Sequence, residues 1–200
     1  MHAVASTELS AETRARILDA AWQRVREGGP GSASVKGVAA AAGVSRQLVY
    51  FHFGNRAGLL LAMTRHHDRA SGFADRVSAA AELEPVAGFE ALLRAWLAYL
   101  PEILPTARAL EAAHVTGDEG GEAWVDRMGD LHAVVRAATK RLAAVGRLQD
   151  GWTAARAADW AWAAIQPARY DHLVAQRGWA PATYADRTVA ALLAELVGPA

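Results

Sequence analysis

Residues 34–60 read SVKGVAAAAGVSRQLVYFHFGNRAGLL, and this stretch predicts two short helices joined by a tight turn. Its first half has apolar side chains at three- and four-residue spacing, which is typical of one buried helix face. These residues are Val35, Val38, Ala39 and Ala42. Gly43 then ends the pattern, because glycine readily adopts the left-handed backbone found where a helix stops sharply. Val44 is expected to fill the corner between the two helices.

Ser45 is placed to begin the second helix, at about residues 46–51, because its hydroxyl can accept a bond from an unpaired N–H group of the first turn. Val49 is expected to face the core. The residues left on the outer face are Arg46, Gln47, Leu48 and Tyr50. A small residue at the helix crossing, a glycine in the turn and an apolar inward residue favour a helix-turn-helix. In such a unit the second helix enters the major groove of DNA.

This stretch resembles the DNA-binding domain of TetR-type transcriptional regulators. The match consists of AGVS at residues 42–45, Tyr50, the His52-Phe53 pair, Asn55-Arg56 and Leu59-Leu60, preceded by ILDAA at residues 17–21. It covers about residues 10–65. The chain departs from the family pattern at Val25, Gly37, Arg56 and Ala57. Gly37 inside a helix is expected to cost about 1 kcal/mol relative to alanine.

The resemblance implies an all-α fold of about nine helices in three parts. Residues 1–9 are expected to be a flexible N-terminus, and residues 10–55 a three-helix helix-turn-helix domain. Residues 56–200 are expected to form a helical effector-binding and dimerisation domain, linked through the fourth helix. Expected helices lie at about residues 10–27, 35–42, 46–51, 56–80, 89–100, 103–114, 122–145, 153–176 and 183–196, with Pro101, Pro105 and Pro167 as breaks or kinks.

Nine residues are the candidates for DNA contact. Arg46 can donate two bonds to guanine, Gln47 can pair with adenine, and Leu48 can touch a thymine methyl group. Contacts to phosphate, which fix register and carry little sequence information, are expected from a further set. That set is Ser34, Lys36, Ser45, Tyr50, His52 and Arg56. The alternative is that these are ordinary solvated side chains on short helices.

Composition is compatible with this interpretation. The chain has 200 residues, of which 52% are hydrophobic, and no cysteine, which excludes disulfides and thiolate metal sites. No apolar run is long enough for a membrane span and no signal pattern is visible, so a cytoplasmic protein without membrane contact is expected. Residues 1–70 carry a net charge of +4 and the remainder −4. A basic N-terminal part on an acidic body fits a DNA reader joined to a regulatory domain.

The resemblance also implies a ligand cavity in the body, between helices that pair across a homodimer. Aromatic walls with a few polar tips are typical of a pocket for an apolar ligand. The candidates are Trp96, Tyr99, Leu100, Trp124, Met128, Leu131, Trp162, Gln166 and Tyr170. Each of them could equally belong to the core. No cofactor is expected, and no metal either, because His66 and His67 point about 100° apart on a helix.

The sequence therefore favours a homodimeric repressor that a small, largely apolar or aromatic ligand releases from operator DNA. A transcriptional activator would use the same contacts. Two alternatives belong to other classes. An all-helical enzyme or small-molecule carrier lacks a recognisable catalytic motif, and an architectural DNA-binding protein would have a filled body without a pocket of about 300 Å³ or more.

Overall fold

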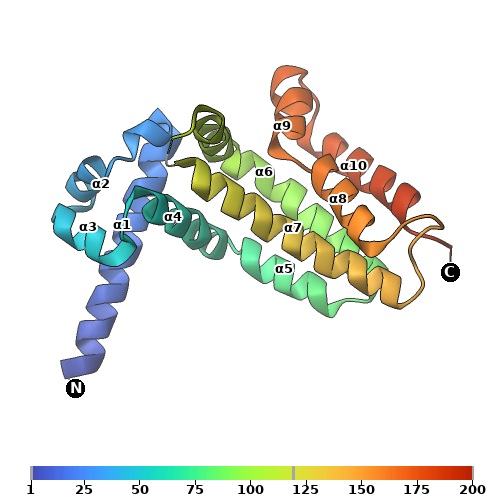
Figure 1. The fold of residues 1–200 in the computed structure, drawn as a ribbon, viewed down its shortest axis with the longest axis horizontal. Coiled ribbons are helices and arrows are strands. Elements are labelled where there is room, and N and C mark those ends of the chain that lie inside the picture. The colour runs from blue at the N-terminus through green and yellow to red at the C-terminus, as the bar shows by residue number, and fades with distance from the viewer. Residues whose placement is uncertain (1, 119, 200) are drawn as a thin grey trace. The chain divides into compact units, whose positions relative to one another are not determined.

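The computed structural model describes residues 2–118 and 120–199, and within these ranges the chain is helical with no strand. A single isolated bridge pairs Leu148 with Val197. The all-α prediction is confirmed. The elements in order are α1 His2–Gly28, η1 Pro30–Ser32, α2 Val35–Ala42, α3 Arg46–Phe53, α4 Arg56–Ala70, α5 Phe73–Glu82, α6 Pro85–Thr116, α7 Gly120–Ala144, α8 Ala154–Ala164, α9 Pro167–Tyr170, the π-helical η2 Asp171–Gln176, and α10 Pro181–Leu196 (Figure 1).

The chain divides into two compact units with three boundaries, of which one lies between α4 and α5 and the other two fall inside the long helices α6 and α7. The first unit is Met1–Ser71 with Pro105–Arg127, and the second is Gly72–Leu104 with Met128–Ala200. Helices α6 and α7 are therefore each divided between the two units. Residues 105–116 of α6 and 120–127 of α7 belong to the first unit, and the rest of both helices belongs to the second. Each unit has its own buried apolar side chains.

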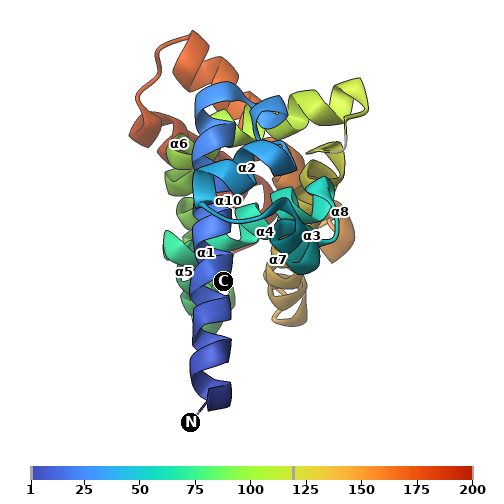
Figure 2. The same ribbon diagram turned by 90° about the vertical axis from the view of Figure 1, so that its left-hand side faces the viewer.

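In the first unit, α1 packs on α2 and α4, and α2 packs on α3 (Figure 2). The side chains at this centre are less than 2% exposed: Ile17, Leu18, Ala21 and Val25 of α1, Val38 of α2, Val49 of α3, and Leu59, Leu60 and Met63 of α4. Gly43 ends α2 with a φ of 65°, as the sequence predicts. Arg16 Nε on α1 donates to the Ala42 carbonyl at 3.1 Å and so fixes that end of α2.

Gly37 has a packing role that the sequence does not reveal. The Arg24 guanidinium lies over it, so that a Cβ added at Gly37 would come within 2.8 Å of Nη2. Arg24 Nε also donates to the Ser32 carbonyl at 2.7 Å. An alanine at this position would gain helix propensity, but it would have to displace the arginine that holds the turn before α2.

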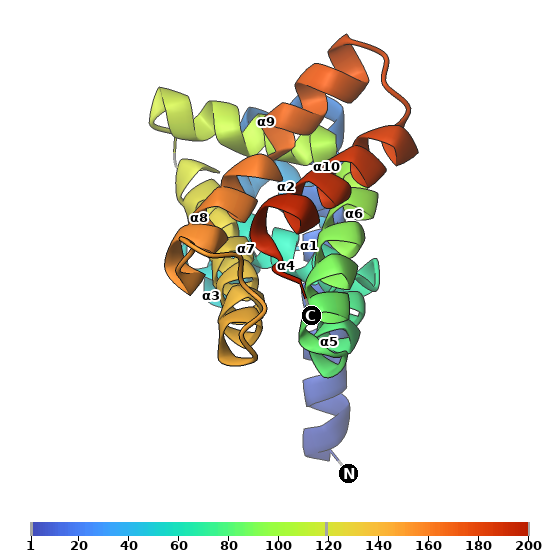
Figure 3. The ribbon, with the colours of Figure 1, turned by 90° about the vertical axis from the view of Figure 1, so that its right-hand side faces the viewer.

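The second unit is a helical bundle in which α8 lies beside α10 (Figure 3). Its fully buried side chains include Phe89, Leu93 and Leu100 of α6, Leu142 of α7, and Val189 and Leu196 of α10. Gly88 lets α6 approach α5 closely, because a Cβ there would lie only 2.6 Å from the Ala80 carbonyl oxygen. Trp96 Nε1 donates to the Ile165 carbonyl at 2.8 Å and so joins α6 to the end of α8.

Helix α1 begins upstream of the predicted start. Residues 2–9, expected to be a flexible N-terminus, are helical and continue without a break into the helix predicted from residue 10. The segment contains neither glycine nor proline, so nothing in it breaks a helix.

The single helix predicted at residues 56–80 is wrong, since α4 ends at Ala70 and α5 starts at Phe73. Gly72 between them has a φ of 70°, a left-handed conformation that an α-helix cannot continue through.

The separate helices predicted at residues 89–100 and 103–114 are also wrong, because α6 is continuous. Pro101 and Pro105 sit on its exposed side, while buried Leu100, Leu104 and other apolar residues hold the helix by packing.

The helix predicted at residues 153–176 is interrupted. Thr153 caps its start, accepting from Arg156 N at 3.3 Å, but α8 ends at Ala164. Gln166 is extended, and Pro167 occupies the first turn of α9. Proline is favoured at that position because its missing N–H is not needed there. It therefore starts a new helix and does not kink an existing one.

Candidate DNA-binding interface and ligand groove

The recognition helix of the candidate DNA interface is α3, and its conformation follows from two local features. The Ser45 hydroxyl oxygen accepts from Leu48 N at 3.1 Å, with Ser45 in an extended conformation, as expected of an N-cap. Val49 is 1% exposed and fixes the inner face of the helix. Arg46, Gln47 and Tyr50 are exposed and Leu48 is half-buried. The helix therefore presents a row of polar and aromatic side chains to solvent.

Phe51 belongs to the same outer face, and sequence reasoning missed it. Its side chain is 81% exposed, more than the 52% of Tyr50. Together with Tyr50, it gives α3 two adjacent exposed aromatic rings beside its polar side chains. The i, i+4 relation to exposed Gln47 could have revealed it, because residues four apart share a helix face.

The start of α2 supplies two further candidates. Ser34 caps the helix, accepting from Gly37 N at 3.1 Å, and its side chain stays at the surface. Lys36 is exposed in the first turn. Both residues are thus accessible to an anion near the N-terminal end of α2, where unpaired N–H groups also favour negative charge.

His52 lies in a basic cavity of about 320 Å³ in the first unit. The lining residues come from α1, α3 and α4: Arg14, His52, Phe53, Gly58, Leu61, Ala62, Arg65 and Arg69. The Arg14 guanidinium carbon lies 5.3 Å from the centroid of the Phe53 ring, and Arg65 pairs with Asp126 at 2.8 Å. No carboxylate is part of this lining, which makes the cavity an anion-attracting surface.

Arg56, the predicted phosphate contact at the start of α4, has a protein partner. Its Nη1 lies 2.6 Å from Oδ1 of Asp118, and only 15% of its side chain is exposed. Its Nε donates to the Ala33 carbonyl at 3.4 Å. The pKa of Asp118 is lowered, first by the bond that its carboxylate accepts from Gly120 N and then by Arg56. A phosphate bound by Arg56 would therefore compete with the carboxylate of Asp118.

The consecutive residues His66, His67 and Asp68 each have a structural partner. His66 Nε2 lies 3.0 Å from Asp19 Oδ1, the His67 ring stacks on Trp22 with centroids 3.6 Å apart, and Asp68 pairs with Arg127. In the part of the chain that the structure describes, no three His, Asp or Glu side chains are grouped to hold a metal ion.

The predicted ligand residues are distributed over both units. Trp124 lies in the first unit, and the other eight lie in the second. Leu100 and Leu131 are buried. Tyr99 stacks on Phe73 with centroids 4.6 Å apart, and Trp96 contacts both rings.

The remaining candidates are also bonded or packed. Trp162 Nε1 donates to the Met128 carbonyl at 3.0 Å, and Gln166 Nε2 donates to the Trp162 carbonyl at 3.1 Å. The Tyr170 ring meets Tyr184 edge-on at 5.3 Å. Burial raises the pKa of both tyrosines.

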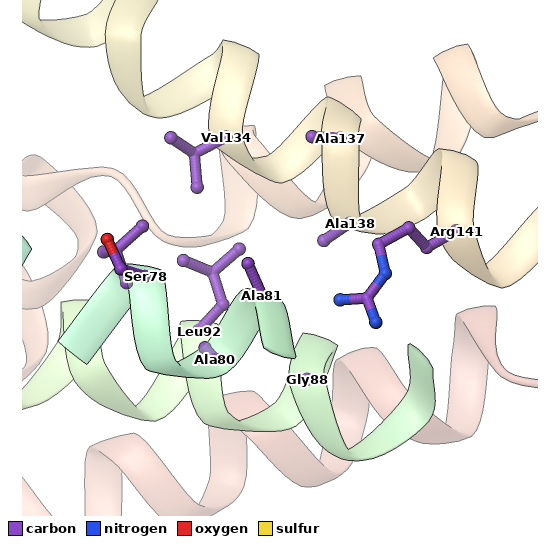
Figure 4. Close-up of a pocket in the computed structure, with 10 residues that line it drawn as sticks. Ser78, Ala80, Ala81, Gly88, Leu92, Val134, Ala137, Ala138 and Arg141 are labelled. Atoms are coloured by element: carbon purple, nitrogen blue, oxygen red, sulfur yellow. The ribbon is translucent and has the colours of Figure 1, made fainter. Parts of the chain in front are cut away.

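A groove elsewhere in the second unit contains none of these residues. It lies between α5, the start of α6 and the end of α7, and its volume is about 270 Å³ (Figure 4). Its lining is Val77, Ser78, Ala80, Ala81, Gly88, Leu92, Val134, Ala137, Ala138 and Arg141. Figure 4 shows Val134 and Arg141 turned from α7 toward the α5 and α6 side. This groove is an apolar space with one charged residue in its wall.

No helix in the described ranges is both long enough and apolar enough to cross a membrane.

Comparison with known proteins identifies the N-terminal segment: residues 17–63 match the sequence model of bacterial regulatory proteins of the tetR family. No curated protein matches the chain significantly.

Solved structures resemble nearly the whole chain. A protein of Rhodococcus sp., described as a TetR-family transcriptional regulator, has a TM-score of 0.77 at 20% identity and covers 93% of this chain and 99% of its own. NalD, the secondary repressor of the MexAB-OprM multidrug efflux pump in Pseudomonas aeruginosa, has 26% identity and a TM-score of 0.68, covering 94% and 97%. A transcriptional regulator of Saccharomonospora viridis in complex with choline has 16% identity and a TM-score of 0.72, covering 94% and 100%.

Proposed function

We propose that the chain is a TetR-type DNA-binding regulator, and specifically a homodimeric repressor that a small ligand releases from operator DNA. The match of residues 17–63 to the tetR family model and the shared fold support this proposal. The observation that supports DNA reading by specific residues is the geometry of α3. Ser45 caps the helix and Val49 anchors it, so Arg46, Gln47 and Tyr50 are held outward on a rigid scaffold.

The proposed contacts fall into two groups. Arg46 and Gln47 read base edges, and Leu48 touches an apolar base group. The other candidates hold the DNA backbone, and exposed Phe51 joins them by packing against sugar or base. Those backbone candidates are Ser34, Lys36, Ser45, Tyr50, His52 and Arg56.

Two subunits are required because one recognition helix reads too few base pairs. In a dimer the two α3 helices enter successive major grooves when they sit about 34–36 Å apart. A ligand releases the DNA if it binds better to a dimer whose spacing does not match, and it shifts the equilibrium only by that difference in affinity. The cytoplasm, where operator DNA lies, is the proposed place of action.

The α5–α6–α7 groove is the proposed effector site. Its volume of about 270 Å³ is close to the lower end of ligand pockets, roughly 300 Å³. That volume falls just below the size of about 300 Å³ that would separate an effector-binding body from the filled body of an architectural protein, so ligand binding at the groove is the test between the two. The three structural neighbours are described as transcriptional regulators or a repressor, so no observation favours an enzyme or carrier.

Fluorescence anisotropy with DNA flanking the protein's own gene tests the proposal. We expect sequence-selective binding that weakens steeply with salt, and loss of that binding in Arg46→Ala and Tyr50→Ala. Arg136→Ala is the matched control, because Arg136 is an exposed cation on α7 in the second unit. Equal loss in the control, or no selection from a randomised DNA library by ligand-stripped protein, would refute DNA reading by α3.

A further inference from the structure

We propose that the α5–α6–α7 groove binds a small amphipathic carboxylate, with the acid paired to Arg141 and the apolar chain lying along α5 and α7. This inference rests on the proposed function, because it names the ligand class of the effector site. The groove combines three features that together select such a molecule: one cation, an apolar wall and a limited volume.

The first feature is the charge. Arg141 is the charged residue of the lining, and no Asp or Glu belongs to it. In the described part of the chain no carboxylate lies within ion-pair distance of Arg141. A guanidinium without an acid partner beside an apolar surface attracts an anion, and bonds between two charged groups are about twice as strong as neutral ones.

The second feature is how Arg141 is held. Its Nη2 donates to the Leu83 carbonyl at the end of α5, which anchors the guanidinium at the groove. Nη1 faces Gly88, where a Cβ would lie 3.3 Å away. The lack of a side chain at Gly88 leaves room for this nitrogen beside α6. An anchored guanidinium in the wall of the groove can bind a carboxylate with little loss of side-chain entropy.

The third feature is the apolar wall and its size. Val77, Leu92 and Val134 form the sides, and alanines leave the space between them. An apolar cavity of about 150 Å³ takes a benzene molecule of six carbon atoms. By proportion, 270 Å³ takes roughly eleven non-hydrogen atoms. Octanoate and 3-phenylpropanoate have about this size, whereas large polycyclic compounds do not fit.

The same wall argues against cationic ligands such as the choline seen in the Saccharomonospora viridis neighbour. Recognition of a quaternary ammonium group uses aromatic faces, and no aromatic residue lines this groove. Arg141 would also repel such a cation. The proposal therefore separates carboxylates from alcohols and from ammonium compounds of equal chain length.

Isothermal titration of the purified full chain, without DNA, tests the proposal directly. The probes are octanoate, 3-phenylpropanoate, octanol and octyltrimethylammonium. We expect the two acids to bind one per groove, and octanol to bind about 10- to 100-fold more weakly, because it lacks the charge-assisted bonds. Binding of octanol as tight as that of octanoate, or no binding of either acid, overturns the proposal.

Three variants separate the charge of Arg141 from its structural role. Arg141→Gln keeps a donor for the Leu83 carbonyl but removes the charge, so we expect it to fold and to bind octanoate at least tenfold more weakly. Arg141→Lys restores the charge and is expected to recover most of the affinity. Ala138→Leu fills the groove and should abolish binding of all probes. If Ala138→Leu changes only the oligomeric state, the groove is a contact between subunits and the proposal fails.

Failure of this inference and failure of the proposed function give different results. If octanoate binds the wild-type protein but does not release DNA, the carboxylate site stands and ligand release does not. If neither acid binds while selective DNA binding persists, the carboxylate site is wrong and the regulator assignment stands. Circular dichroism of each variant shows whether loss of binding reflects loss of fold.

Discussion

Arg56 is the residue at which the predicted DNA contact and the observed structure compete. In the structure its guanidinium pairs with Asp118, whereas the repressor proposal gives it to a DNA phosphate. We predict that Arg56 exchanges one anion for the other on DNA binding. Asp118 would then oppose binding, and Asp118→Asn should strengthen it. The asparagine Oδ1 can still accept the 2.9 Å bond from Gly120 N, so the turn before α7 is kept.

The structure limits the size of this effect. Asp118 is 43% exposed and Arg56 15%, so the pair belongs with the weakly stabilising surface pairs, at roughly 0.2–1 kcal/mol. Removing it is expected to raise DNA affinity about 1.4- to 5-fold for each subunit, or roughly 2- to 30-fold for a dimer. The salt dependence should not change, because Arg56 contacts phosphate in both proteins. Arg56→Gln, in contrast, should reduce the salt slope by about 0.9 per subunit.

Fluorescence anisotropy over a salt series, applied to both single variants and to the double variant, measures this coupling. Asp126→Asn is the matched control, because Asp126 is a similarly exposed carboxylate of the first unit that pairs with another arginine, Arg65. If Asp118→Asn strengthens binding equally when Arg56 is already glutamine, the exchange does not occur. The same conclusion follows if the Asp126 variant shows an equal gain, since loss of any negative charge would then suffice.

Three further predictions concern stability. Ser45→Ala removes the cap on Leu48 N and should cost about 1 kcal/mol in chemical denaturation and weaken DNA binding, whereas Ser45→Asn should retain both. Phe89→Ala, at a side chain with no exposure, should cost about 3–5 kcal/mol, and Phe89→Leu much less. Because the folded pKa of Asp118 is lowered, its contribution is present above its unfolded pKa of about 3.9 and is lost as pH falls through the folded value. Acid unfolding of Asp118→Asn should therefore show a smaller loss of stability below pH 4.

The helix-turn-helix could be predicted from sequence because local rules determine it. Gly43 ends α2 in the left-handed region, Ser45 caps α3, and Asn55 caps α4 by accepting from Gly58 N at 2.8 Å. Each feature depends on residues no more than four apart. The break at Gly72 follows a local rule as well, but one glycine in an otherwise helical pattern does not reveal its backbone angle.

The prolines show where local rules fail. Pro101 and Pro105 predict an interruption, yet α6 continues because its buried face holds it on both sides of them. Pro167 predicts a kink, yet it starts a separate helix. Whether a proline bends, ends or begins a helix depends on packing partners far away in the chain, and one sequence does not identify those partners.

The ligand groove could not be predicted for a related reason. The sequence favours large aromatic residues as pocket candidates because aromatic walls are common in ligand sites. In the structure Trp96 and Tyr99 pack against Phe73, and the α5–α6–α7 groove has no aromatic lining. The groove exists because the residues facing it are small. Ala81 and Ala138 leave space only once α5 and α7 are placed against the start of α6. In a chain rich in alanine, no individual alanine indicates such a space.

The charge at the groove depends on distant contacts in the same way. From sequence, Arg141 is an arginine in the last turn of a helix, where a cation is favoured by the helix dipole and usually lies in solvent. The folded chain directs it across to the Leu83 carbonyl, 58 positions earlier, and so beside the apolar wall. Local rules therefore recover the surface proposed to read DNA, which is built from adjacent turns of helix. They do not recover the proposed effector site, because both its space and its charge arise from contacts between helices that are remote in sequence.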